Sequence, residues 1–305
     1  MRALLLLLVA ACGETPIAND SGADVATEAQ VDASADIADV VAETDAQKPT
    51  GTIIRIMSAN ITSGTQQSYE DPGIRIFQGL LPDVVLIQEF DYQTGGPSAL
   101  VAKAFGASFS YFVEPSVNIP NGIVSRFPIL SSGAWVDASV TDRGFAWALI
   151  DLPGPIDLFA VSLHLLTTGV TERDTEAKQV VSLVQQNAPQ GVYLVIGGDL
   201  NTDATNEAAI TDLGALVVTA APYPTDQNGN TNTSTNRNRP HDWVLADPTL
   251  QAHAVATWVG NSMYVPGLVF DSRVYTPLSE VAPVLASDSA TAGMQHMAVV
   301  RDFAF

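Results

Sequence analysis

The stretch VYLVIGGDLNTD, Val192–Asp203, decides the fold class of this chain. Its first five residues, Val192–Ile196, are apolar and partly β-branched, as expected for a strand that is buried on both faces. Two glycines follow, and glycine lets the backbone turn or lets another group approach closely. Asp199 and Asn201 come next, where α/β proteins place binding and catalytic side chains. The alternative is an ordinary turn after a strand, because Gly, Asp and Asn are common turn residues.

Other apolar runs in the chain also adjoin polar side chains. Three apolar runs end just before a polar side chain: Thr52–Met57 before Asn60, Asp83–Gln88 before Glu89, and Asp157–Leu163 before His164. Two apolar runs begin just after a polar side chain: Trp243–Ala246 after Asp242, and Met297–Phe303 after His296. Strand ends of an α/β protein that carry such side chains converge on one rim. The last two strands must therefore run antiparallel to the others, which predicts mixed sheets.

Predicted helices alternate with these strands. The clearest helix is Glu172–Asn187, which carries Ala177, Val180, Val181 and Val184 on one face. Two more helices are predicted at Ile74–Leu81, starting near Tyr69, and at Ser98–Phe105. The remaining predicted strands are Ser110–Val113, Gly122–Ser125, and Phe145–Leu152 in a hairpin with Asp157–Leu163.

The composition describes a globular protein with a large hydrophobic core. Of the 305 residues, 47% are hydrophobic, and the net charge of −20 is unevenly spread. Residues 51–305 carry 24 acidic against 11 basic residues. Such a surface repels polyanions on average, and it has no basic stripe of the kind that announces nucleic-acid binding.

The N-terminal sequence MRALLLLLVAAC indicates a targeting segment, because its apolar run is far too short to span a bilayer. Residues 1–11 are predicted to be a signal peptide, and residues 9–12 resemble a bacterial lipobox. Cys12 would then be the lipidated first residue of the mature protein. It is the only cysteine, so it cannot form an internal disulfide. The alternative is an ordinary signal peptide that is cut nearby.

Residues 12–50 are predicted to form an acidic, disordered tether, and residues 51–305 the folded domain. Residues 13–50 contain nine acidic residues, one Lys and no aromatic residue. Such a segment cannot bury enough apolar surface to offset the entropy lost on ordering. With Cys12 acylated, the domain is predicted to lie in the cell envelope outside the cytoplasm, on the outer membrane or the cell surface.

Six motifs in order resemble the endonuclease/exonuclease/phosphatase family. They are SAN at 58–60, QE at 88–89, SLHL at 162–165, GDLN at 198–201, HDWV at 241–244 and QHMAVV at 295–300. Pancreatic-type deoxyribonucleases, neutral sphingomyelinases and inositol polyphosphate 5-phosphatases share this fold. The resemblance covers residues 51–305 and implies a four-layer α/β sandwich of two packed mixed β-sheets. It also implies a divalent-metal phosphoesterase site at one end of the sheets.

The resemblance implies a role for each motif residue. Glu89 would be the main metal ligand with Asn60 beside it, and these oxygen ligands suit Mg²⁺ or Mn²⁺. His296 would be the general base, with Asp242 fixing its tautomer. The remaining implied roles are Asp199 positioning the attacking water, Asn201 binding the substrate phosphate, and His164 donating to a non-bridging oxygen.

Three arginines are predicted to bind substrate. Arg143 occupies a place where family members often carry a phosphate-facing residue. Arg237 and Arg239 lie in the Asn- and Thr-rich loop 226–239, which leads to Asp242. A loop that ends at a catalytic rim commonly shapes substrate choice. The alternative is a solvated surface loop, and His241 is interpreted as a residue that flanks Asp242.

The final motif departs from the family pattern. The family usually has Ser-Asp-His before the last strand, but here Gln295 precedes His296. The expected carboxylate is therefore an amide, which leaves the number of bound metals open. Asp288 is a possible replacement, although no His follows it and no apolar strand starts there.

These observations predict a lipid-anchored, monomeric, metal-dependent phosphoesterase that hydrolyses phosphodiesters. Nucleic acid is the leading substrate, and the alternative substrates are a phospholipid headgroup, as in sphingomyelinases, or an inositol phosphate. From a different class, the domain could be a non-catalytic binding lipoprotein. The joint presence of all the motif residues speaks against that last reading, because a site without function should lose ligands first. A zinc-type metallophosphatase is disfavoured, since its Asp-x-His and Gly-Asn-His signatures are absent.

The predicted lipobox can be tested directly. Cys12→Ala should move the protein from the detergent-soluble membrane fraction to the soluble fraction, because it removes the only acylated residue. Phosphodiesterase activity should stay unchanged. A Cys12→Ala protein that stays in the membrane fraction would show that the lipobox interpretation is wrong.

Overall fold

The computed structural model describes residues 48–63, 70–290 and 294–305. The predicted signal peptide 1–11, Cys12, most of the tether 12–50 and the predicted helix start at Tyr69 lie outside these residues. Within the described residues, no helix is long and apolar enough to cross a membrane.

The first sheet has seven strands and is built around the first and last strands of the domain. Its order is β10-β14-β1-β2-β4-β3, and β13 also pairs with β14. Strands β1 and β2 are parallel, whereas β14 runs antiparallel to β1. The bounds are β1 Ile53–Ser63, β2 Val84–Phe90, β3 Ser110–Val113, β4 Gly122–Ser125, β10 Ala254–Val255, β13 Leu268–Phe270 and β14 Ala298–Ala304. A separate hairpin joins β11 Thr257–Val259 to β12 Ser262–Tyr264.

The second sheet has five strands in the order β5-β6-β7-β8-β9. Strands β7 and β8 are parallel, and β9 runs antiparallel to β8. The bounds are β5 Ile129–Val136, β6 Gly144–Ile150, β7 Leu158–His164, β8 Tyr193–Asp199 and β9 Asp242–Ala246. Both sheets are therefore mixed, as the positions of Asp242 and His296 before their strands predict.

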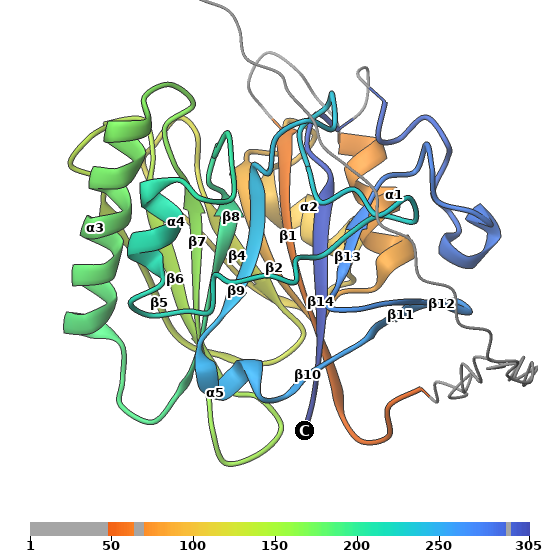
Figure 1. Ribbon diagram of the computed structural model, residues 1–305, viewed down its shortest axis with the longest axis horizontal. Helices are drawn as coiled ribbons and strands as arrows, with labels where there is room; N and C mark the ends of the chain where they lie inside the picture. The colour runs from red at the N-terminus through yellow and green to blue at the C-terminus, as the bar shows by residue number, and fades with distance from the viewer. Residues whose placement is uncertain (1–47, 64–69, 291–293) are drawn as a thin grey trace, which may run out of the picture. The chain divides into compact units, whose positions relative to one another are not determined.

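The two sheets pack face to face, and helices cover their outer faces (Figure 1). Helices α1 and α2 cover the seven-stranded sheet, and α3 and α4 cover the five-stranded sheet. The helix bounds are α1 Glu70–Leu80, α2 Gly96–Ala104, α3 Val170–Asn187, α4 Ala208–Leu213, α5 Pro248–Gln251 and the 3₁₀ helix η1 Leu278–Val281. This arrangement is the predicted four-layer α/β sandwich of two packed mixed sheets.

Strand alternation gives three hydrophobic layers. On β1, Ile54 and Ile56 face the other sheet, whereas Met57 and Ala59 face the helices. On β8, Tyr193 and Val195 pack between the sheets, whereas Leu194 and Ile196 face α3 and α4. Continued to the strand ends, the same alternation points Asn60 and Asp199 into the layer between the sheets.

The two sheets lie close together beside Gly197 and Gly198, which precede Asp199 at the end of β8. A side chain on Gly197 would overlap Trp243 O of the neighbouring strand β9, and it would lie 2.8 Å from Leu86 Cδ1 in the opposite sheet. Gly198 has a φ of +134°, and a side chain there would overlap Leu163 O and lie 2.8 Å from Gln88 Nε2. Gln88 instead donates to Ser162 Oγ at 2.9 Å, a hydrogen bond that joins the two sheets. The glycines therefore serve sheet packing, one of the two uses that the sequence suggests.

The structure also contains elements that the sequence analysis does not predict. These elements are β5, α4, α5, η1 and the short strands β10 to β13. Strand β5 reads ILSSGAWV and carries no clean alternation, because it is the edge strand of its sheet and much of it is exposed. Strand β1 continues past the predicted Met57 to Ser63.

Gly198→Ala should destabilise the domain. The added Cβ would meet the backbone of Leu163 at a φ that L residues rarely adopt. We expect a loss of about 3 kcal/mol or more in the free energy of unfolding. For a domain of this size, that loss lowers Tm by roughly 6–12 °C in a thermal melt.

Gly154→Ala is the matched control for this experiment. Gly154 has nearly the same φ, +130°, but a Cβ there has no atom within 4 Å. It should cost only the backbone strain, about 1 kcal/mol. Equal losses for the two variants would mean that crowding by Leu163 of β7 and Gln88 of β2 is not what requires glycine at position 198.

Candidate functional site

Six strand ends meet on one rim of the sandwich, and they bring most of the predicted site residues together. In the sheets, Asn60 pairs with Gln88, His164 pairs with Asp199, and Asp199 pairs with Asp242. His296 joins them just before β14. The residues gathered at this rim are Asn60, Glu89, His164, Asp199, Asn201, Asp242 and His296.

Asp199 lies at the centre of the contacts at this rim. Its Oδ2 accepts a hydrogen bond from Asn60 Nδ2 at 3.0 Å, and it lies 3.4 Å from His164 Nε2 and 3.5 Å from His296 Nε2. Its Oδ1 accepts from the Asn201 backbone N–H at 2.9 Å. Asp199 is almost fully buried. Burial acts to raise the pKa of Asp199, but the charge of nearby His296 leads the opposing effects, and the pKa is lowered below its ordinary value. Asp199 is therefore a carboxylate at neutral pH.

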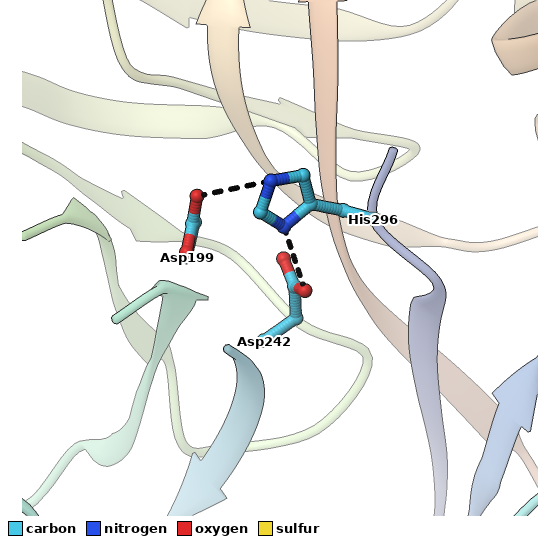
Figure 2. Close-up of side chains that lie close together, drawn as sticks. All are labelled: Asp199, Asp242 and His296. Atoms are coloured by element: carbon cyan, nitrogen blue, oxygen red, sulfur yellow. Dashed lines mark hydrogen bonds and ion pairs between the residues drawn. The ribbon is translucent and has the colours of Figure 1, made fainter. Parts of the chain in front are cut away.

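His296 lies between two carboxylates, as Figure 2 shows. Its Nδ1 is 3.0 Å from Asp242 Oδ2, and its Nε2 faces Asp199. Burial acts to lower the pKa of His296, but the charges of Asp199 and Asp242 prevail and raise it to about 10. With no cation nearby, His296 is therefore an imidazolium at neutral pH, whereas a general base must be neutral.

His164 has the opposite electrostatic environment. It is buried at the end of β7, and its Nδ1 has no hydrogen-bond partner among the described residues. Burial lowers the pKa of His164 to about 3. The ring is therefore neutral at any working pH, and Nε2 can donate one hydrogen bond without carrying charge.

Glu89 reaches the site because the backbone breaks the strand alternation. By alternation, Glu89 would face the helices, as Val85 and Ile87 do. Its φ of +55°, unusual for a residue with a side chain, turns the carboxylate toward Asn60, whose Nδ2 lies 3.2 Å from Glu89 Oε1. Burial raises the pKa of Glu89, with the negative charge of Asp199 adding to the effect. A buried carboxylate of this kind would be stabilised by a cation.

Thr233 positions the two members of the His296–Asp242 pair, and the sequence analysis does not identify it. Its Oγ1 accepts from the Asp242 backbone N–H at 2.8 Å, and its carbonyl accepts from the Met297 N–H at 2.7 Å. Ser234 forms an isolated antiparallel bridge with His296. The loop therefore fixes the distance between the pair, and only its Asn- and Thr-rich composition gives a signal in the sequence.

Arg143 lies near the rim, as the family pattern suggests. It is 8% exposed, and its Nε donates to Asp142 Oδ1 at 3.1 Å. Its Nη1 is buried and has no hydrogen-bond partner among the described residues. Its charge acts on the pKa values of both Glu89 and His164. Arg143 therefore keeps a free donor close to the site.

The prediction that Arg237 binds substrate is corrected by its contacts. Its guanidinium pairs with Asp226 at 2.7 Å and with Asp271 at 2.6 Å. It also donates to the Asn232 carbonyl at 2.7 Å. These contacts use the guanidinium to hold the loop in shape. Arg239 differs, because it is largely exposed and pairs with the half-exposed Asp203 at 2.9 Å.

A polar groove of about 400 Å³ opens beside His296. Its lining contains no acidic, aliphatic or large aromatic residue, although the domain as a whole is acidic. The ring of His241 lies 5.6 Å from that of His296, so His241 belongs to the groove and does more than flank Asp242. The lining residues are Thr167, Asn201, Ser234, Thr235, Asn236, Asn238, Arg239, His241, Gln295 and His296.

The structure distinguishes Gln295 from Asp288, the two residues whose roles at the final motif the sequence leaves undecided. Gln295 lines the groove, and its backbone carbonyl accepts from Thr235 Oγ1. Asp288 instead forms an ion pair with Arg75 of α1 at 2.6 Å and accepts from the Leu285 N–H. Asp288 is therefore committed to Arg75, and it is not a replacement for the family carboxylate.

Comparison with known proteins identifies a family for this chain and proteins that share its fold. A family model described as the endonuclease/exonuclease/phosphatase family matches residues 29–262, a range that stops before His296. No match was found among the curated proteins.

Three solved structures illustrate the likeness, and at these identities they show the fold alone. An endonuclease/exonuclease/phosphatase from Beutenbergia cavernae DSM 12333 is 18% identical, with a TM-score of 0.56 over 83% of this chain and 72% of that one. Truncated TDP2 from Caenorhabditis elegans is 16% identical, with a TM-score of 0.53 over 83% and 98%. An endonuclease/exonuclease/phosphatase from Bacteroides vulgatus is 16% identical, with a TM-score of 0.58 over 82% and 98%.

His164→Gln should reduce the loss of stability in acid. In the folded protein the pKa of His164 is about 3, against an ordinary value of 6.5, so only the unfolded chain takes up this proton between those values. The wild type therefore loses free energy of unfolding as the pH falls below 6.5, by about 3 kcal/mol at pH 4 from this group. Urea denaturation at pH 7, 5 and 4 measures the free energy of unfolding of both proteins. If both lose the same free energy as the pH falls, burial of a neutral His164 is not the cause of the loss.

Proposed function

The chain belongs to the endonuclease/exonuclease/phosphatase family, and we propose that it is a divalent-metal-dependent phosphoesterase that hydrolyses phosphodiester bonds, with nucleic acid as the leading substrate. The observation that carries the proposal is the placement of His296. It is held between Asp242 and Asp199 at the edge of a groove that is rich in hydrogen-bond donors. Such a pair can move a proton next to a bound phosphate.

The charge balance of the rim supports a divalent cation. Three buried carboxyl groups, Glu89, Asp199 and Asp242, gather at this rim, and burial raises the pKa of Glu89 and of Asp242. A divalent cation would stabilise their charged forms, and hard oxygen donors suit Mg²⁺ or Mn²⁺. The positive charge of the ion would also lower the pKa of His296 and leave its ring neutral, as a base requires.

Glu89 and Asn60 are the residues that would hold this cation. The Asn60 amide turns its nitrogen toward the carboxylates of Glu89 and Asp199, where it supplies partial positive charge. Its oxygen accepts from the Thr62 backbone N–H at 2.9 Å. To coordinate a cation, the amide would have to turn its oxygen toward the rim. When bound, the cation would stabilise the negative charge that develops on the phosphate.

A second arrangement of ligands is possible by distance alone. Single ligand atoms of Asp199, Asp242 and His296 lie within 4.8 Å of one another. A metal there would require His296 to lose its proton and its hydrogen bond to Asp242. The carboxylates hold that proton strongly, so we place the cation at Glu89 and Asn60.

The roles of the remaining residues follow from their positions. Asp242 holds the Nδ1 proton of His296, which leaves Nε2 to accept a proton from water at the Asp199 side. Neutral His164 and the free donor of Arg143 would bind non-bridging phosphate oxygens. Asn201 uses one amide proton on the Leu165 carbonyl at 3.0 Å, and its second proton can reach the groove.

The groove favours a polar phosphodiester over the acyl part of a lipid. It offers Asn, Thr, Arg and His donors to a phosphate backbone, and it offers no apolar wall for an acyl chain. An acid-free groove in an acidic domain would also admit an anionic strand. The second candidate is the headgroup of a phospholipid or an inositol phosphate, which the predicted lipid anchor at Cys12 would bring close to the enzyme.

The substrate class and the two central residues can be tested together. We expect the wild type to hydrolyse at least one of the following substrates in the presence of Mg²⁺ or Mn²⁺: DNA, RNA, sphingomyelin, an inositol phosphate or a chromogenic diester. A chelator should abolish this activity. His296→Ala and Asp199→Ala should each lower turnover by at least roughly 10²-fold, the scale of a lost general base.

His253→Gln is the matched control in this assay. His253 lies away from the rim, where it contacts Tyr193 and stacks on Phe305, so its loss should leave turnover unchanged. Absence of turnover on every one of these substrates with every metal would instead favour a binding protein. Wild-type turnover in either rim variant would remove that residue from the mechanism.

A further inference from the structure

A second cavity lies behind the catalytic rim, between the two sheets and the segment that follows α4. Its volume is about 150 Å³, and its walls are mainly apolar. A cavity of this volume lined by apolar side chains is large enough to hold a benzene ring. The exposed residues Ala220 and Ala221 also line it and connect it to solvent. Its inner walls include Val218, Tyr223, Trp243, Val269 and Val299.

Arg301 of β14 supplies a positive charge to this cavity. By strand alternation it lies on the same face as Val299 and Phe303, in the layer between the sheets, and it is 6% exposed. Its Nη1 donates to the Val244 carbonyl at 3.2 Å, and its Nη2 donates to Gln251 Oε1 at 2.7 Å. Its Nε is buried and has no hydrogen-bond partner among the described residues.

Arg301 differs from the other arginines in having no carboxylate partner. Every other arginine of the described residues forms an ion pair with Asp or Glu. Burial without such a partner lowers the pKa of Arg301 to about 10. The only acidic residue in the cavity wall is Asp242, whose charge is balanced by His296. A buried guanidinium in this setting is stabilised by an anion.

A purely structural role explains part of this arrangement. Strand β9 is the edge of its sheet, so the carbonyl of Val244 needs a donor, and Arg301 provides it. Gln251 ties the same guanidinium to α5. Neither contact accounts for the free Nε, and a neutral donor would serve both acceptors. The structural role also leaves the adjoining cavity without an explanation.

We propose that this cavity binds a small carboxylate with an apolar body of about the size of a benzene ring, and that Arg301 binds its carboxylate group. The apolar part would fill the space against Trp243 and Val299, and the anion would satisfy the guanidinium of Arg301. Charge-assisted hydrogen bonds of this kind are the strongest that side chains form.

Benzoate is the probe for this site, and benzyl alcohol is its neutral match in size. Calorimetric titration of the full chain should give a millimolar or tighter dissociation constant for benzoate. Benzyl alcohol should bind at least tenfold more weakly, because a hydrogen bond between charged partners is worth about 10- to 100-fold in affinity. Benzoate at ten times its dissociation constant should raise Tm by a few degrees.

Two variants separate the proposed site from a structural arginine. Arg301→Met keeps the length of the side chain and should weaken the binding of benzoate by at least tenfold. The affinity for benzyl alcohol should stay unchanged. Val218→Phe keeps Arg301 but should fill the cavity and abolish binding of both probes. This variant still tests the proposal if Arg301→Met does not fold. Arg126→Met, whose arginine pairs with Asp83 at 2.9 Å outside the cavity wall, is the control and should bind as the wild type does.

Three results would overturn the proposal. The first is failure of benzoate to bind the wild type, and the second is equal binding of benzoate and benzyl alcohol. The third is unchanged benzoate affinity in folded Arg301→Met or in folded Val218→Phe. Each would leave Arg301 as a donor to Val244 and Gln251 alone.

Discussion

The close contact of the two sheets at the end of β8 is the constraint on which the site depends. Gly197 and Gly198 leave room for Leu86 and Gln88 of the opposite sheet, and the Gln88–Ser162 hydrogen bond closes the gap. Only at that separation can Asn60 of one sheet donate to Asp199 of the other at 3.0 Å. The close packing of the two sheets therefore also brings their carboxylates together at the rim. The negative charge of the site is a consequence of this packing.

Strand alternation explains which part of the site the sequence predicts. A period of two residues carries the inter-sheet face of β1 and β8 through to Asn60 and Asp199. The positions of Asp242 and His296 before their strands predict that β9 and β14 run antiparallel to β8 and β1, and the structure confirms both directions. Glu89 is different, because alternation would turn it toward the helices. Its place at the rim depends on a backbone angle of +55°, which no local pattern announces.

Other features of the site depend on contacts between residues far apart in the chain. Arg237 looks like a free cation in the sequence, but Asp271, which pairs with it, lies on another segment. Asp288 looks available until Arg75 of α1 is placed beside it. Thr233 has no motif at all, and its hydrogen bonds to the backbone of Asp242 and Met297 exist only in the folded loop. The sequence supplies candidate chemical groups, and the tertiary fold determines which of them remain free.

The position of β14 governs the order in which the domain can assemble. This strand lies inside the seven-stranded sheet, paired with β1 on one side and with β10 and β13 on the other, yet it follows them all in the chain. Pairing β1 with β14 closes a loop that contains nearly the whole domain, and contacts of such long sequence separation form slowly. Until they form, β1 exposes one open edge, and His296 is not yet beside Asp242. A partly synthesised chain that lacks β14 therefore cannot bring His296 beside Asp242, so the proposed site forms only after β14 has paired with β1.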